Sequence, residues 1–217
     1  MAALTLTTFD WVPEMPRGFV RDLRVRWALE EAGIPYHAVL VGDGGNVSRE
    51  DYAKIQPFGQ IPAIEDGDFK LFESGAIVQY IAERSTKLMP SDRERRAEVV
   101  QWMFTALNTI EMPVQNLASI DLFYANEDWA KQRRPGAVDM VRKRLGELAG
   151  CLEDRQFLAG EFSAADILMA SVLKILRHTD LVAEQPKLAA YLKRCEARPA
   201  FARALAGQMA AFKQAAA

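Results

Sequence analysis

The sequence predicts two domains of different class, an α/β domain with a mixed sheet followed by an all-helical bundle. Over residues 1–84, short β-prone runs alternate with helix-like periodicity. The polar stretch at 86–92, which contains Pro90, then marks a change of composition. After it no convincing strand pattern appears, and helical patterns continue to residue 213. These three observations place the first domain at 1–84 and the second at 92–217.

Helical periodicity first appears at residues 20–32, where Val20, Leu23 and Trp27 share one face. Gly33 follows as a natural terminator, because glycine adopts the left-handed conformation at a helix end without strain. Short β-prone runs stand on either side of this helix. The elements expected up to this point are a strand at 4–8, the helix at 20–32, a strand at 36–41 and a short helix at 50–54.

A hairpin is predicted around Asp66 and Gly67, because Asp-Gly is among the stronger short turn signals. Residues 61–65 and 69–72 flank this turn and provide its two strands. A helix at 74–83 then closes the region. The order β-α-β, short α, β-β-α predicts an α/β sandwich with a four-stranded mixed sheet.

The second region shows only helical patterns. An apolar stripe marks the helix after the boundary, and a nearly all-apolar helix lies in the middle of the region. The last two helices each open with proline, which suits a first turn. Helices are expected at 93–117, 135–154, 164–176, 186–198 and 199–213.

The composition and net charge of the chain indicate which kind of partner it binds. Half of the residues are apolar, so a sizeable core can form, and the net charge is only -2, from 27 basic and 29 acidic residues. This balance argues against nucleic acid or an anionic membrane and favours a small molecule. The first residues lack a basic region followed by an apolar run, so we expect a cytoplasmic protein. His37 and His178 stand alone, and no metal site is predicted.

Three separated blocks carry a resemblance to a known family. The segment QPFGQIPAI at 56–64, followed by LFESGAI at 71–77, closely resembles the glutathione-binding half of cytosolic glutathione transferases. The segment WALEEAGIPY at 27–36 matches the end of that family's first helix and the entry to its second strand. FSAADI at 162–167 matches its C-terminal-domain signature. The resemblance covers the whole chain and implies a thioredoxin-like N-terminal domain, glutathione as co-substrate, and a homodimer.

The resemblance assigns the glutathione backbone to Ile61 and Pro62. A proline directly before a buried strand can hold a cis peptide, which turns the backbone of the preceding residue outward. In the family this arrangement places that residue's N–H and C=O against the cysteinyl part of glutathione. Without the downstream Glu73-Ser74, the same proline would equally suit an ordinary turn. Gln60 and Lys54 are assigned to the glycine end of glutathione.

Glu73 and Ser74 lie where a strand is predicted to pass into a helix. Free N–H groups and the helix dipole favour a carboxylate ligand there. The resemblance implies that Ser74 binds the γ-glutamyl carboxylate through its hydroxyl and N–H, while Glu73 faces the α-amino group. Serine also suits a helix cap, and both roles are expected together.

Ser163 and Asp166 form a capping-box pattern, with an acidic residue three places after the cap serine. The pattern predicts a structural role at the start of the apolar helix. In the family the corresponding pair organises a buried helix and takes no part in catalysis. We therefore leave Asp166 out of the candidate active site.

The sequence departs from the family at the residue that contacts sulfur. Members usually present Tyr, Ser or Cys near the start of the first helix, and none occurs between residues 9 and 32. Arg21 stands near the expected position and Arg17 in the preceding loop; a cation there would stabilise a thiolate. Alternatively, these arginines form a solvated face with Arg24 and Arg26. Weaker candidates for sulfur contact are Thr7, Thr8 and Trp11.

The resemblance implies conjugation of the glutathione thiolate to an electrophilic, apolar small molecule. Residues assigned to the acceptor pocket are Trp11, Trp102, Phe104, Phe123 and Tyr124. Two alternatives remain: a glutathione-dependent peroxidase, reductase or isomerase on the same scaffold, and a glutathione-binding or regulatory protein without catalysis. The missing Tyr, Ser or Cys supports the last alternative.

Overall fold

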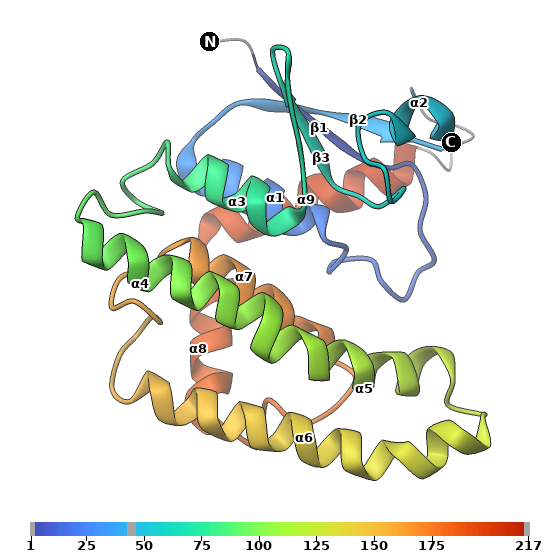
Figure 1. Cartoon of the computed structure of the whole chain (residues 1–217), viewed down its shortest axis with the longest axis vertical. Coiled ribbons are helices and arrows are strands. Elements are labelled where there is room, and N and C mark those ends of the chain that lie inside the picture. The colour runs from blue at the N-terminus through green and yellow to red at the C-terminus, as the bar shows by residue number, and fades with distance from the viewer. Residues whose placement is uncertain (1–2, 43–46, 215–217) are drawn as a thin grey trace. The chain divides into compact units, whose positions relative to one another are not determined.

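The computed structural model describes residues 3–42 and 47–214 (Figure 1). The chain forms two compact units. Unit 1 combines Met1–Met89 with Arg198–Ala217, and unit 2 is Pro90–Ala197. The sequence analysis had grouped everything after residue 92 together, whereas the last helix clusters with the N-terminal elements.

Unit 1 contains a four-stranded sheet in the order β2-β1-β3-β4. The strands are β1 (Leu4–Phe9), β2 (Tyr36–Val41), β3 (Ala63–Asp66) and β4 (Phe69–Phe72). Strand β1 pairs in parallel with β2 and antiparallel with β3, so Leu6 lies opposite both Ala38 and Ile64. The β3–β4 pair is antiparallel. The predicted mixed sheet and hairpin are confirmed.

The helices of the N-terminal segment are α1 (Asp22–Ala32), α2 (Arg49–Ala53) and α3 (Ser74–Ala82). Helix α1 ends at Gly33, whose φ of 68° lets its N–H reach the carbonyl of Leu29. Every residue from Asp22 to Leu29 is buried. A surface helix would keep one polar face in water, so α1 must be covered on more than one side.

Helix α9 (Pro199–Gln214) supplies the second cover, and Figure 1 shows it beside α1. The ring of Phe201 meets Trp27 edge-on at 4.9 Å between centroids. Arg198 binds Glu31 through two hydrogen bonds of 2.5 and 2.8 Å, and Arg203 binds Glu30 at 2.7 Å. The sequence pattern predicted a helix at 199–213 as part of the helical bundle and held no information about what this helix packs against.

The first helical stretch of unit 2 is longer than the predicted 93–117 and is interrupted. Helix α4 (Arg93–Phe104) passes into a π-helical turn η1 (Thr105–Ile110) and then into α5 (Glu111–Phe123). A π-helical turn carries more residues per turn than an α-helix and so changes the rotation of the chain. Val99, Met103, Ile110 and Val114 nevertheless keep a continuous buried stripe.

Helix α6 (Asp128–Leu152) begins before Pro135, which the sequence analysis had placed at its start. Proline removes one helical N–H donor and is usually excluded from a helix interior. Here residues 131–136 are all exposed, so water can solvate the carbonyl that Pro135 leaves without a helical donor.

The centre of unit 2 is α7 (Ala164–Leu173), in which all ten residues are buried. The 3-10 turn η2 (Lys174–Leu176) and α8 (Pro186–Glu196) follow it. The predicted capping box is confirmed, because Ser163 and Asp166 cap the start of α7 reciprocally.

Candidate functional site

The peptide bond between Ile61 and Pro62 is cis, as the sequence analysis proposed. The segment before it is fixed by Gln56, whose buried side-chain oxygen accepts from the N–H groups of Phe58 at 2.6 Å and Gln60 at 3.2 Å. The Tyr52 hydroxyl donates to the carbonyl of Gln60 at 2.7 Å. Burial raises the pKa of Tyr52, so the hydroxyl remains a donor.

These contacts hold the entry to β3 rigid. Val41, Tyr52, Ile61 and Ala63 form one buried apolar cluster beneath it. A peptide ligand could therefore meet a backbone that is already shaped for main-chain hydrogen bonds, in the manner of strand addition.

Glu73 and Ser74 lie where the sequence analysis placed them, between the end of β4 and the start of α3. Glu73 has a φ of 72°, an uncommon value for a residue with a side chain, and such values gather at functional sites. Ser74 is buried, whereas the side chain of Glu73 is exposed. The expectation that Ser74 caps the helix is wrong, because Glu73 occupies the N-cap position and Ser74 is the first helical residue.

Arg24 is a site residue that sequence reasoning missed. Its guanidinium donates to the hydroxyl oxygen of Ser74 at 3.3 Å, and only 3% of the residue is exposed. A solvated face for Arg24 and Arg26 is therefore wrong: both are buried, and Arg26 pairs with buried Asp22 at 2.8 Å. The spacing of Asp22 and Arg26, four residues apart, was the only signal of this pair in the sequence.

The contact between Arg24 and Ser74 joins the first turn of α1 to the first turn of α3. Both helices thus direct the positive end of their dipole into one neighbourhood, to which Arg24 adds a full positive charge. Such a place suits an anion such as a carboxylate or a thiolate.

The two candidates for sulfur activation occupy different settings. Arg21 is the N-cap residue of α1 and is partly buried. Arg17 is folded onto its own loop, where two guanidinium nitrogens donate to the carbonyl of Val12, each at 3.3 Å. Its guanidinium also lies over the ring of Phe212, 5.9 Å from the centroid.

Among the weaker sulfur candidates, Thr7 and Thr8 are buried on β1, and 59% of Trp11 is exposed. Trp11 was also assigned to the acceptor pocket. The other acceptor candidates belong to unit 2, where Trp102 is a buried core residue. Phe104, Phe123 and Tyr124 are exposed by 57%, 68% and 46%.

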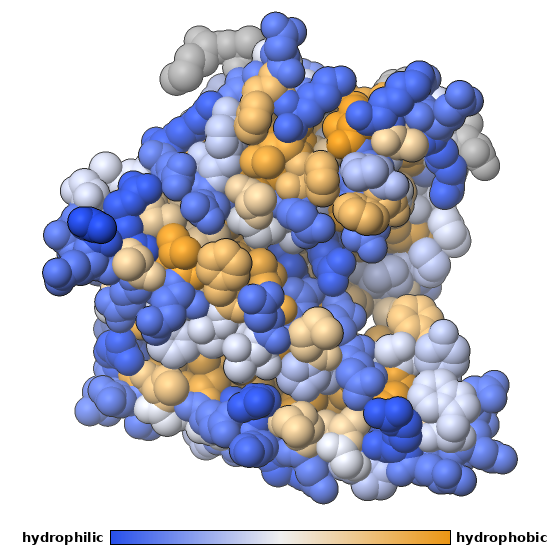
Figure 2. Space-filling view, in the orientation of Figure 1, coloured by the Kyte–Doolittle hydropathy of each residue, from blue (hydrophilic) through white to orange (hydrophobic). Residues whose placement is uncertain are grey.

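Further apolar side chains gather on the face of unit 1 shown in Figure 2, over the region of β3, β4 and α2. The large hydrophobic residues exposed in that part of the chain are Phe58 and Phe69. Contiguous exposed apolar surface commonly marks a site of association.

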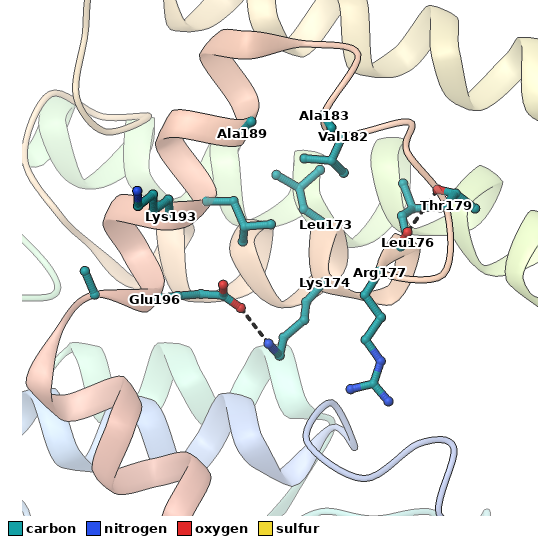
Figure 3. Close-up of a pocket in the computed structure, with 12 residues that line it drawn as sticks. Leu173, Lys174, Leu176, Arg177, Thr179, Val182, Ala183, Ala189, Lys193 and Glu196 are labelled. Atoms are coloured by element: carbon teal, nitrogen blue, oxygen red, sulfur yellow. Dashed lines mark hydrogen bonds and ion pairs between the residues drawn. The ribbon is translucent and has the colours of Figure 1, made fainter.

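A cavity of about 560 Å³ lies within unit 2 (Figure 3). Residues of α7, η2, α8 and the loop between η2 and α8 line it, with Leu173, Val182 and Ala189 among the apolar side chains. Lys174 pairs with Glu196 at 2.6 Å along one side. Within the described part of the chain, its lining includes none of the five residues assigned to the acceptor pocket.

Residues 3–42 and 47–214 contain neither a membrane-spanning helix nor a cluster of metal ligands. No helix in these ranges is long and apolar enough to cross a membrane. No three His, Cys, Asp or Glu side chains in them gather as a metal site would require.

Comparison with protein families gives two matches. The profile described as "Glutathione S-transferase, N-terminal domain" matches residues 5–83, and the profile "Glutathione S-transferase, C-terminal domain" matches residues 121–199. Together they include the cis-proline segment, the start of α3 and the capping box of α7.

Individual glutathione transferases are similar to this chain over most of its length. Glutathione S-transferase F14 of Arabidopsis thaliana is 30% identical over 192 residues, which are 81% of this chain and 75% of that protein. A glutathione S-transferase of Hyoscyamus muticus is 30% identical over 84% of this chain and 92% of its own. A crystal structure of a Pseudomonas putida glutathione transferase, with one glutathione disulfide bound per subunit, superposes with a TM-score of 0.80. That pair is 28% identical and covers 94% of this chain and 90% of the other.

Proposed function

The chain belongs to the glutathione S-transferase family, and we propose that it binds reduced glutathione and transfers its thiolate to an electrophilic, apolar small molecule. One observation supports this most: the cis peptide before Pro62 occurs in the same unit as Glu73 and Ser74 at the start of α3. A backbone edge and an anion site together match the two ends of a short acidic peptide.

In the proposed complex, the backbone of Ile61 before Pro62 pairs with the cysteinyl part of glutathione, and Gln60 faces its glycine end. Ser74 binds the γ-glutamyl carboxylate, and Glu73 faces the α-amino group. Arg24 supports the role of Ser74. Because its guanidinium donates to the Ser74 oxygen, the hydroxyl proton of Ser74 is left to donate to a ligand carboxylate.

The thiolate is proposed to lie near the start of α1, where Arg21 and the helix dipole favour the charged form of the thiol. A free thiol has a pKa of about 8.5, so little thiolate forms near neutral pH without help. Arg17 is the second candidate, although its guanidinium already binds the carbonyl of Val12.

Replacing Arg21 with glutamine is expected to raise the pKa of bound glutathione by about 1 to 2 pH units, because a nearby positive charge is lost. The rate near neutral pH should fall and recover partly at higher pH, where the thiolate forms unaided. Thiolate absorbance of the glutathione complex against pH measures the change. Arg21→Lys, which keeps the charge, should titrate close to wild type.

Arg17→Gln serves as the matched variant in the same loop, and we expect a smaller change there. Unchanged titrations in both glutamine variants would exclude both arginines. The sulfur partner would then be a backbone N–H or a hydroxyl such as that of Thr8.

The missing Tyr, Ser or Cys favours one other function, a glutathione-binding protein without catalysis. Calorimetric titration with glutathione, together with turnover assays on a panel of electrophiles, peroxides and isomerase substrates, separates the proposals. Binding with conjugation of at least one electrophile supports the transferase. Binding without turnover of any substrate supports the non-catalytic protein, and absence of binding contradicts both.

We also propose that the chain forms a homodimer that acts in the cytoplasm, as family membership suggests. Large apolar side chains remain exposed on both units, including Phe58 and Phe69 in unit 1 and Phe104 and Met112 in unit 2. Sedimentation at micromolar concentration should give a species of about twice the chain mass of 24.3 kDa. A single species of the chain mass would contradict the dimer.

A further inference from the structure

The loop between β1 and α1 contains Arg17 and Arg21, and a buried side chain of the last helix hydrogen-bonds its backbone. Gln208 of α9 is fully buried. Its side-chain oxygen accepts from the N–H of Gly18 at 3.1 Å, and its side-chain nitrogen donates to the carbonyl of Val20 at 3.1 Å. Gln208 therefore binds the backbone of the two residues that flank Phe19, and the second of these, Val20, directly precedes Arg21.

The same side-chain nitrogen of Gln208 donates to Asp22, the first residue of α1, at 2.5 Å. Asp22 is fully buried and also binds Arg26 at 2.8 Å. Burial raises the pKa of Asp22, while the charge of Arg26 and the hydrogen bonds of Arg26 and Gln208 act in the opposite direction. Gln208 thus fixes the first turn of α1 as well as the loop that leads into it.

A second contact comes from the same face of α9. Phe212 lies one helical turn after Gln208, and its ring lies beneath the guanidinium of Arg17. By contrast, Arg198 and Arg203 attach α9 to Glu31 and Glu30, at the opposite end of α1. One end of the α1–α9 contact therefore holds the loop before α1 and the first turn of that helix, and the other end holds its last turn.

We propose that Gln208 is a positioning residue for the sulfur site: through Gly18, Val20 and Asp22, it holds the loop and the N-terminus of α1 in the geometry that stabilises the thiolate. The proposal rests on the proposed function. An irregular loop without such bonds would sample many conformations, and each would move Arg21 and the α1 dipole relative to the sulfur. The proposed contacts of glutathione with Ile61 and Ser74 involve no residue of this loop.

The test compares Gln208→Met with Arg203→Gln. Methionine approximates the volume of glutamine but makes none of its three hydrogen bonds, and Arg203→Gln removes a contact between α9 and the far end of α1. In Gln208→Met we expect the Gly18 amide to exchange its hydrogen about tenfold faster or more, because its acceptor is gone. This readout needs no glutathione.

With glutathione, Gln208→Met should raise the pKa of the bound thiol and lower kcat near neutral pH about tenfold. The KM for glutathione should change less than kcat, because Ile61, Glu73 and Ser74 lie outside the loop and α1, and only the supporting contact of Arg24 lies in the first turn of α1. Arg203→Gln should leave all three quantities near their wild-type values. If the substitutions acted only through the stability of the fold, the thiol pKa, kcat and KM would change in both variants, each in proportion to its loss of stability.

Several outcomes would overturn the proposal. One is a folded Gln208→Met protein with unchanged thiol titration, and another is an equal effect of Arg203→Gln. If Gln208→Met fails to fold, the wild-type protein decides, because its Gly18 amide should be as protected as core amides of α1. Free exchange at wild-type Gly18 excludes the positioning role. Failure of wild type to bind glutathione contradicts the proposed function itself, whatever Gly18 exchange shows.

Discussion

Replacing Asp166 with alanine is expected to lower the free energy of unfolding by about 3–5 kcal/mol, because two buried backbone N–H groups lose their acceptor at about 1–3 kcal/mol each, whereas the two hydroxyl donors can rotate. One carboxylate oxygen of Asp166 accepts from the N–H of Leu158 at 3.0 Å and the hydroxyl of Tyr191 at 2.9 Å. The other accepts from the N–H and the hydroxyl of Ser163, at 2.9 and 3.2 Å. Four donors would lose one common acceptor in the centre of unit 2.

Urea denaturation followed by circular dichroism measures this loss. Asp92→Ala is the matched control, because Asp92 also caps a helix, α4, but is exposed and accepts from a single N–H at 2.9 Å. It should cost about 1 kcal/mol. Equal losses in the two variants would show that the buried network of Asp166 adds nothing to an ordinary helix cap.

Glu73→Ala and Ser74→Ala are each expected to weaken glutathione binding by about 1–3 kcal/mol, or roughly 5- to 150-fold in Kd. In the proposed complex, each substitution leaves a polar group of glutathione without its partner. Ser74→Ala also removes one acceptor of buried Arg24. We therefore expect Ser74→Ala to lie toward the upper end of this range.

Calorimetric titration with glutathione measures both losses. Glu83→Ala, at the opposite end of α3, controls for general effects on the helix and should bind as wild type does. A folded variant of Glu73 or Ser74 that retains wild-type affinity would remove that residue from the proposed site.

The elements that sequence predicted well are those defined by neighbouring residues. Gly33 ends α1, Asp66 and Gly67 form the hairpin turn, and Ser163 with Asp166 caps α7. Each of these signals acts within about four residues, where backbone conformation and side-chain capping decide the outcome.

Sequence reasoning did less well where an outcome depends on distant parts of the chain. The hydrogen bond between Arg24 and Ser74 joins residues 50 positions apart, and an arginine between apolar neighbours gave no hint of it. The partner of α9 was missed for the same reason, because periodicity identifies a buried face without its cover. Pro135 was misplaced because solvent at an exposed helix face can replace a lost backbone bond.

The candidate site contains both residues that the sequence indicated and contacts between distant residues that it did not. Pro62, Glu73 and Ser74 were found through the family resemblance of a contiguous segment, and the structure places them at a cis bond and a helix start. The proposed place of sulfur activation is the loop before α1, whose sequence departs from the family. Gln208, which binds the backbone of that loop, lies far along the chain, and no local pattern indicates the contact.

The attachment of α9 to unit 1 also bears on how the chain folds during synthesis. Residues 1–89 emerge from the ribosome first, but helix α1 then lacks the cover that α9 provides. At common rates of translation, α9 follows on the order of ten seconds later, after all of unit 2 has been made. Throughout that interval Trp27 of α1 lacks Phe201 of α9, which packs against it in the folded chain. Unit 2, in contrast, is continuous in the chain and can complete its core before synthesis ends.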